Sequence, residues 1–239
     1  MPNEVLIETD GPVQILTLNR PDKLNAVNEA LSQNLRQAIT NAAHDDKIAV
    51  VILTGSGRAF SAGADLKEAA KNGERPQRQS LQAASNSTVI YEALIACDKP
   101  VIAAVNGYAL GAGSAIAISC DLVIASDNAV LGYPELKHGL AATAVSPTLV
   151  AQIGRKPASE LLLLAENITS QRALEIGLIN RVVPSQELMA CAKTWASTLA
   201  GHNHDALWMT KRMIRRSSEM TLSQAHSLAA DSLTVMRGF

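Results

Sequence analysis

The chain has 239 residues, of which 47% are hydrophobic and 18% charged, and its formal net charge is −1. This length is sufficient for one α/β domain with a large core. The small net charge gives no electrostatic argument for binding nucleic acid or an anionic membrane, so neither partner is expected. Three widely spaced cysteines in apolar contexts predict free thiols in a reducing, cytoplasmic compartment and no metal site: Cys97, Cys120 and Cys191.

The N-terminal region predicts an antiparallel strand pair, residues 5–9 and 13–18, joined at Asp10-Gly11-Pro12. It lacks the charged and apolar regions of a secretory signal. Asn28 is expected to cap a helix that runs to about His44. Further apolar runs alternate with helical stretches, which predicts β-α crossovers with strands near residues 48–54, 101–105, 121–125 and 179–183.

Two of these strands lead into loops of very small residues. Ala62-Gly63-Ala64 follows the strand near 48–54, and Gly111-Ala112-Gly113 follows residues 101–105 and opens a buried helix over 112–120. Backbone N–H groups in such loops can approach a ligand closely. Two loops on neighbouring strands therefore predict an oxyanion hole, with close helix-to-strand packing as the structural alternative.

Five segments together resemble the enoyl-CoA hydratase/isomerase superfamily, the crotonases. The segment Ile102 to Leu122 is similar to the signature of the family, and Gly57 to Glu68 (GRAFSAGADLKE) is similar to its second hallmark. The resemblance covers nearly the whole chain in the order of the family, and it includes LNRPDKLNAVN (18–28), YPELKHGL (133–140) and TSQRALEIGLINRVVP (169–184).

The resemblance implies an α/β fold, a spiral of β-β-α units, over residues 1–184. Residues 185–239 are expected to form a helical C-terminal trimerisation region, so a homotrimer or hexamer is implied. Members of the family usually continue beyond the Phe239 position for another short helix that helps to cover the nucleotide. We therefore expect a truncated chain or a more open CoA pocket.

The resemblance also implies an acyl-CoA substrate, in which coenzyme A is part of the substrate and no separate cofactor is needed. The N–H groups of Ala62 and Ala112 are the implied oxyanion donors. The CoA thioester is expected along both loops, with the adenine beside the last two residues of this set: Lys23, Leu24, Ala26, Ala62, Ala64, Gly111, Asp65 and Leu66.

One of the two acids of the family's hydratases is missing. The first position is Ala115, whereas the second is Glu135. A carboxylate among apolar residues should have a raised pKa, suited to proton transfer near neutral pH. A single base can move a double bond, so isomerisation of 3-enoyl-CoA to 2-enoyl-CoA is the favoured reaction, with Glu135 as the sole acid and base.

Two alternatives to isomerisation remain open. Residues 139–150 also resemble branched-substrate hydratases that keep only the second glutamate. A non-catalytic acyl-CoA binding or scaffold subunit is the second alternative, although retention of Glu135 and both loops argues against it. The family's dienoyl isomerases carry an acid where Thr143 stands, which disfavours that activity.

Several polar residues near the motif of Glu135 are further candidates. Tyr133 could hydrogen-bond in the site or serve packing, and His138 could orient Glu135, line the acyl pocket or contact another subunit.

Lys71 to Arg78 is predicted to form a loop over the site. A basic helix face is expected to be solvated, with a CoA phosphate contact as the alternative: Lys211, Arg212, Arg215 and Arg216.

Overall fold

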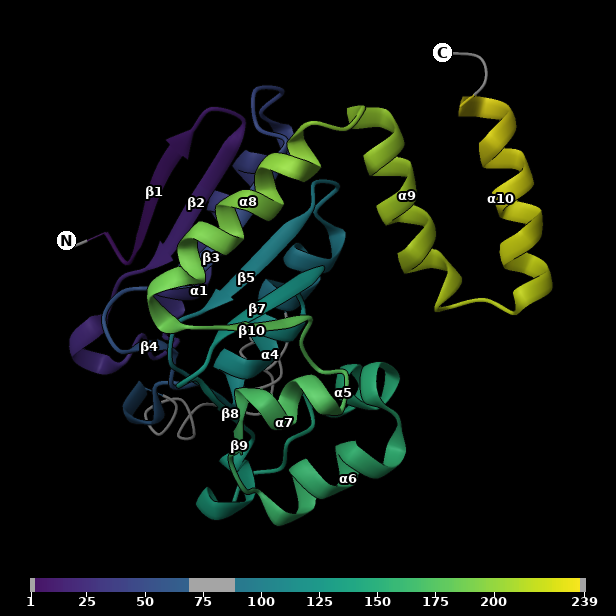
Figure 1. Ribbon diagram of the computed structural model, residues 1–239. Coiled ribbons are helices and arrows are strands. Elements are labelled where there is room, and N and C mark those ends of the chain that lie inside the picture. The colour runs from purple at the N-terminus through teal and green to yellow at the C-terminus, as the bar shows by residue number, and fades with distance from the viewer. Residues whose placement is uncertain (1–2, 69–88, 237–239) are drawn as a thin grey trace, which may run out of the picture.

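The computed structural model describes residues 3–68 and 89–236 (Figure 1). The predicted loop at Lys71 to Arg78 lies outside the described residues. The fold is α/β, built on two sheets with helices on both sides, in agreement with the predicted class.

The larger sheet has the strand order β1-β2-β3-β5-β7-β10. Only the first pair is antiparallel, and it turns at Gly11, whose φ of +56° suits glycine. The other neighbours are parallel, as β-α crossovers require. All six predicted strands are therefore confirmed, at Val5–Asp10, Val13–Leu18, Val50–Gly55, Val101–Val105, Leu122–Ser126 and Arg181–Val183.

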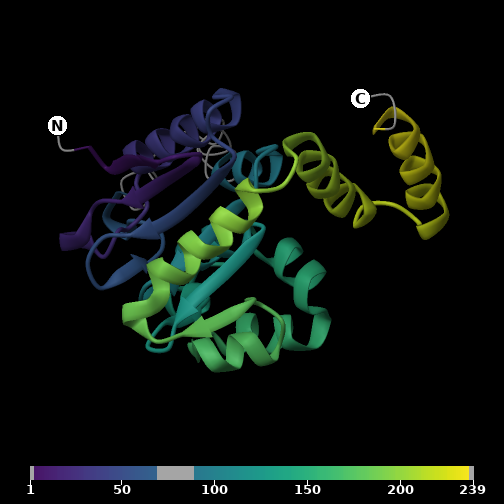
Figure 2. The same cartoon turned by 45° about the horizontal axis from the view of Figure 1, so that its top comes forward.

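The central strands are apolar on both faces because each face supports a separate core. Leu53 and Ala103 point into the larger cluster, whereas Ile52 and Ile102, one residue earlier, point into the smaller one. Helix α1 (Glu29–His44) covers the first face, and α8 (Leu188–Ala200) lies across the second (Figures 1 and 2). The Asn28 side chain accepts from Leu31 N, so the predicted cap of α1 is confirmed.

A second sheet of four short strands, in the order β4-β6-β8-β9, was not expected from the sequence. The first three strands are parallel, and β9 closes the sheet antiparallel to β8. A bulge interrupts β4, where Ala59 faces Tyr108 and Ser61 faces Ala109, so Phe60 has no opposite residue. The strands are Ala59–Ser61, Tyr108–Leu110, Val130–Gly132 and Ile168–Thr169.

The two sheets are connected by a repeated unit. Strand β3 leads into β4, β5 into β6, and β7 into β8, and each short strand is followed by a turn or helix. This repetition is the β-β-α spiral that the resemblance implied. Because β4, β6 and β8 are parallel neighbours, the segments that follow them lie at one edge of the small sheet: residues 62–65, α4 (Ala112–Ile118) and the 3-10 turn η2 (Pro134–His138).

The remaining elements are helical. Residues 89–96 form a helix before β5, and η1 (Pro21–Lys23) precedes α1. In Figure 1, α5 (Ser146–Ile153) and α7 (Ser170–Glu175) lie beside the small sheet and α6 (Arg155–Leu164) lies below it. The 3-10 turn η3 (Ser185–Glu187) leads into α8.

The last two helices, α9 (His204–Ser217) and α10 (Leu222–Met236), project from the rest of the molecule (Figures 1 and 2). The predicted boundary at residue 184, between an α/β core and a helical C-terminal region, stays a prediction. Helix α8 follows this boundary and packs into the core.

Helix α9 is attached to the core by partly buried and exposed polar contacts. Lys211 Nζ donates to Asp121 Oδ2 at 2.6 Å and to the Lys99 carbonyl at 2.8 Å, and Arg215 donates to the Ile95 carbonyl at 3.0 Å. Lys211 thus anchors α9 to the core, so the prediction that its side chain is solvated is wrong.

No described helix is long and apolar enough to span a bilayer.

Candidate active site

The predicted site residues come from three segments at one edge of the small sheet. The loop 62–65 follows β4, Gly111 and Ala112 follow β6, and Tyr133 and Glu135 follow β8. Short parallel strands bring these segments together from positions that are about 70 residues apart in sequence. The geometry of the site is therefore a property of the small sheet.

The loop predicted to bind CoA packs directly on the loop 62–65. Val27 N donates to the Gly63 carbonyl at 2.8 Å, and Asp65 N donates to the Val27 carbonyl at 2.9 Å. These bonds form a short parallel bridge between Val27 and Ala64. The structure thus joins the predicted CoA residues Lys23, Leu24 and Ala26 to the loop that carries Ala62, Ala64, Asp65 and Leu66.

Asn25 is the centre of this junction, although no role was predicted for it. Its side chain is fully buried and donates to the carbonyls of Ser56 and Ala59, and it accepts from Arg20 N at 2.8 Å. Its φ is +55° and that of Leu24 is +50°, conformations that asparagine tolerates better than most residues. A buried asparagine with three partners holds the turn in this shape.

The structure corrects the predicted donor in the loop 62–65. The N–H of Ala62 already donates to the Leu24 carbonyl at 2.9 Å and is not available to a ligand. The N–H of Ala64 has no hydrogen-bond partner within the described residues. Because its neighbours Gly63 and Asp65 bond to Val27, this N–H faces away from Val27, and Ala64 is exposed.

The predicted donor Ala112 is the first residue of α4, and its N–H also lacks a partner within the described residues. Its φ is not positive, so the alanine is unstrained. Gly63 lies against this turn: a Cβ there would be 3.6 Å from Ala112 N and 2.8 Å from the Leu110 carbonyl oxygen. The absence of a side chain at Gly63, whose φ is +99°, therefore lets the two loops meet.

Glu135 points at the same turn. Its Oε1 lies 3.1 Å from where a Cβ on Gly111 would be, and its Oε2 is buried with no hydrogen-bond partner within the described residues. Burial raises the pKa of Glu135, as expected, although a backbone hydrogen bond and His138 oppose the shift. A carboxylate held this way is poised to exchange a proton.

Position 115 offers no second acid. Ala115 lies on α4 with 4% of its surface exposed and packs in the larger core. Among the described residues, the charge that acts on Glu135 is that of His138. Tyr91, from the helix before β5, is close enough that burial and the Glu135 carboxylate raise its pKa to about 12, so it stays protonated.

Tyr133 and His138, both predicted near the substrate, differ from each other in burial. Tyr133 is 1% exposed, and its hydroxyl accepts from Ser114 Oγ at 3.0 Å, so the residue links η2 to α4. Its contact with the substrate stays a prediction. His138 is exposed one 3-10 turn after Glu135. A ring contact with the acyl group stays a prediction.

Sequence reasoning missed Arg20, Asn25 and Ser114. Arg20 and Asn25 stand inside the quoted LNRPDKLNAVN segment, which is the signal that could have identified them. Ser114 gave no signal, because its partner Tyr133 is 19 residues away.

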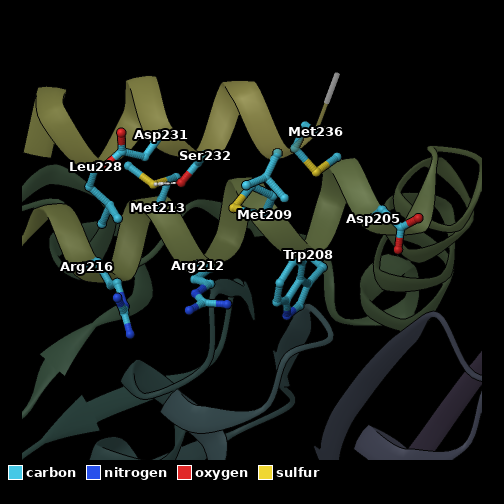
Figure 3. A pocket seen from close by; sticks show the side chains of 11 residues that line it. Asp205, Trp208, Met209, Arg212, Met213, Arg216, Leu228, Asp231, Ser232 and Met236 are labelled. Carbon is cyan, nitrogen blue, oxygen red and sulfur yellow. Dashed lines mark hydrogen bonds between the residues drawn. The ribbon is translucent and has the colours of Figure 1, made fainter. Parts of the chain in front are cut away.

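A separate hollow of about 410 Å³ lies between α9 and α10 and contains none of the predicted site residues. Figure 3 shows side chains of both helices meeting in it, including Met209, Met213 and Leu228. The described residues include no cluster of three or more His, Cys, Asp or Glu side chains suited to a metal ion.

Comparisons with known proteins agree with this geometry. A 2,3-dehydroadipyl-CoA hydratase from Escherichia coli (strain K12) is 40% identical over 223 residues, 92% of this chain and 85% of that protein. The crystal structure of enoyl-CoA hydratase subunit I from Geobacillus kaustophilus HTA426 matches with a TM-score of 0.93 and 32% identity, covering 99% of this chain and 90% of that one. A monofunctional enoyl-CoA isomerase from M. smegmatis matches with a TM-score of 0.80 and 29% identity, covering 94% and 98%.

The same scaffold thus carries proteins named for hydration and for isomerisation. The model of the family described as enoyl-CoA hydratase/isomerase matches residues 8–236, which include both small-residue loops and Glu135. The chain therefore belongs to the enoyl-CoA hydratase/isomerase family, the crotonases, and is an enzyme of that family.

Proposed function

We propose that the enzyme isomerises a 3-enoyl-CoA to the 2-enoyl-CoA, with Glu135 as its only acid and base. In this proposal the N–H groups of Ala64 and Ala112 hold the thioester oxygen, and Ala64 replaces the donor first predicted at Ala62. The observation that carries the proposal is the unpartnered, buried Oε2 of Glu135 beside the Gly111 turn, with alanine at position 115.

The reaction needs one proton carrier. Glu135 removes a proton from C2, and the electron pair forms a dienolate whose charge gathers on the thioester oxygen. The protonated Glu135 then returns the proton to C4, which leaves the double bond between C2 and C3. Atoms and charge balance without water, so a second carboxylate is unnecessary.

The two donors account for the stability of the dienolate. Removing one oxyanion donor from other enzymes costs about 3 kcal/mol in the transition state. The Ala64 and Ala112 N–H groups lie on loops that meet at Gly63, and neither is used within the described residues. This pairing supports a shared oxyanion partner.

Hydration of a 2-enoyl-CoA by one glutamate is the second candidate. The relatives from E. coli and G. kaustophilus are both named as hydratases, which favours this activity for the chain. In that reaction Glu135 would take a proton from water and supply one to C2, two tasks on one carboxylate.

A panel of 2-enoyl and 3-enoyl CoA esters, incubated in deuterated water, separates the candidates. Isomerisation leaves the mass unchanged except for exchanged deuterium and moves the double bond, whereas hydration adds one water. Efficient hydration with no isomerisation would replace the leading proposal. Glu135→Gln should abolish turnover and preserve acetyl-CoA binding; residual activity within about tenfold of wild type would exclude Glu135 as the essential base.

The substrate position and assembly are also proposed. Support for CoA along residues 23–26 and 62–66 is the hydrogen-bonded junction of the two loops. Support for a homotrimer or hexamer is the apolar surface of α9 and α10, where Ile214 and Leu222 are more than 70% exposed. Free thiols at Cys97 and Cys120 fit the proposed cytoplasmic location.

A crystal soaked with acetyl-CoA and a light-scattering mass would test the substrate position and the assembly. CoA bound elsewhere, or a monomer at micromolar concentration, would contradict the respective proposal.

A further inference from the structure

Arg20 lies at the centre of a polar cluster behind the loop 62–65. Its Nη2 donates to Asp65 Oδ2 at 3.1 Å, its Nη1 donates to the Ala26 carbonyl at 2.5 Å, and its Nε lies 3.5 Å from Glu4 Oε1. The side chain is 16% exposed. One guanidinium therefore contacts three segments of the chain.

Two of these contacts flank the bridge that sets the Ala64 N–H. Ala26 precedes Val27, and Asp65 follows Ala64, so Arg20 links the two sides of the Val27 to Ala64 pairing. The planar fork of arginine can hold two acceptors in fixed directions, which a single ammonium cannot. The cluster thus restrains the peptide that presents the donor.

The charges support the same role. Glu4 and Asp65 both lie against Arg20 and are mostly buried, at 19% and 18% side-chain exposure. Although burial opposes ionisation, the Arg20 hydrogen bond and charge, with the N–H groups of Lys67 and Glu68, lower the pKa of Asp65. Without the guanidinium, both carboxylates would remain mostly buried and would lose this positive charge.

We propose that Arg20 is a positioning residue for catalysis. It holds residues 23–26 and the loop 62–65 in the register that aims the Ala64 N–H at the thioester oxygen. This inference rests on the proposed donor role of Ala64. It does not depend on whether the enzyme isomerises or hydrates.

The test uses the red shift of a conjugated 2,4-dienoyl-CoA on binding, because hydrogen bonds to its carbonyl lower the excitation energy. Arg20→Lys, Arg20→Met and Asp65→Asn are compared with wild type at saturating ligand, together with kcat and the melting temperature. Arg172→Lys is the matched control, since Arg172 forms an exposed ion pair with Glu160 at 3.5 Å.

Arg20→Lys should keep its charge and fold, yet lose at least half of the red shift and about tenfold or more in kcat. Arg172→Lys should match wild type. If Arg20→Met does not fold, the lysine and Asp65→Asn variants still decide the matter.

A wild-type red shift and a kcat within about twofold in these variants would overturn the proposal. If wild type itself shows no red shift, the donor assignment fails and this inference fails with it. A wild-type shift with no isomerisation contradicts only the proposed reaction.

Discussion

Oε1 of Glu135 lies 3.1 Å from the position that a Cβ on Gly111 would occupy. The proposed base therefore faces the turn that carries the proposed donor Ala112, with no side chain between them. The φ of Gly111, +49°, adds a second reason for glycine at this position.

Gly111→Ala should lower kcat by at least about tenfold, because the new methyl group displaces the Glu135 carboxylate and the left-handed backbone is strained. Gly177→Ala is the matched control, since Gly177 has a φ of +75° but open space around it. Steady-state kinetics of both variants would contradict the expectation if their losses in kcat were equal.

The acid limb of the pH profile should belong to Glu135. Since the base works as a carboxylate and burial raises its pKa, turnover should fall as the pH drops through a midpoint above the ordinary value of 4.5. Measurement of kcat/KM between about pH 4 and pH 9 checks this. A limb centred at or below 4.5 would contradict it.

Glu135→Gln should stabilise the folded state at neutral pH. A raised pKa means that the native state loses stability as the pH rises from the unfolded value through the folded one, and the glutamine has no charge to desolvate. We expect a gain at pH 7 that disappears near pH 4, measured by urea unfolding. Equal gains at both pH values would show a packing effect instead.

Ala115→Glu should add measurable hydration of a short 2-enoyl-CoA and reduce isomerisation. A second carboxylate could hold a water with Glu135, and repulsion between the two acids would raise both pKa values. Because Ala115 is 4% exposed, the variant should also lose stability. Ala115→Gln, of equal size but uncharged, should show the stability loss without the new activity; hydration by the glutamine variant would refute the two-acid explanation.

Lys211→Met should destabilise the protein by about 1 to 2 kcal/mol, because it leaves the Lys99 carbonyl and the Asp121 carboxylate without their cation. Lys193→Met removes an exposed ion pair with Asp10 and should cost less than about 1 kcal/mol. Denaturant unfolding of both variants makes the comparison. If both variants lost the same unfolding free energy, the contacts of Lys211 would stabilise the protein no more than an exposed ion pair does.

The long strands and α1 could be predicted because each carries its signal locally. Val101–Val105 is one continuous apolar run, and Asn28 stands directly before its helix. The strands β4, β6, β8 and β9 have two or three residues each, too few for any periodicity. They exist because they pair with one another.

The difference between local signals and long-range pairing also explains which site residues could be predicted from the sequence. Glu135 and Ala112 were found from local motifs, and their roles stay predictions. The donor in the loop 62–65 was predicted at Ala62 and is now proposed at Ala64, because the direction of each N–H depends on the Val27 to Ala64 bridge. That bridge joins residues 37 positions apart, which no local pattern encodes.

The bulge at Phe60 determines the direction in which each following residue of β4 and of the loop 62–65 points. Ala59 and Ser61 oppose consecutive residues of β6, so the chain beyond them is offset by one residue relative to a regular strand. Removing one residue here would restore the regular pairing and reverse the outward and inward directions downstream. The N–H groups of Gly63 and Asp65 would then point to the side on which the N–H of Ala64, the proposed donor, lies. This stretch of the gene should therefore accept no single-codon insertion or deletion.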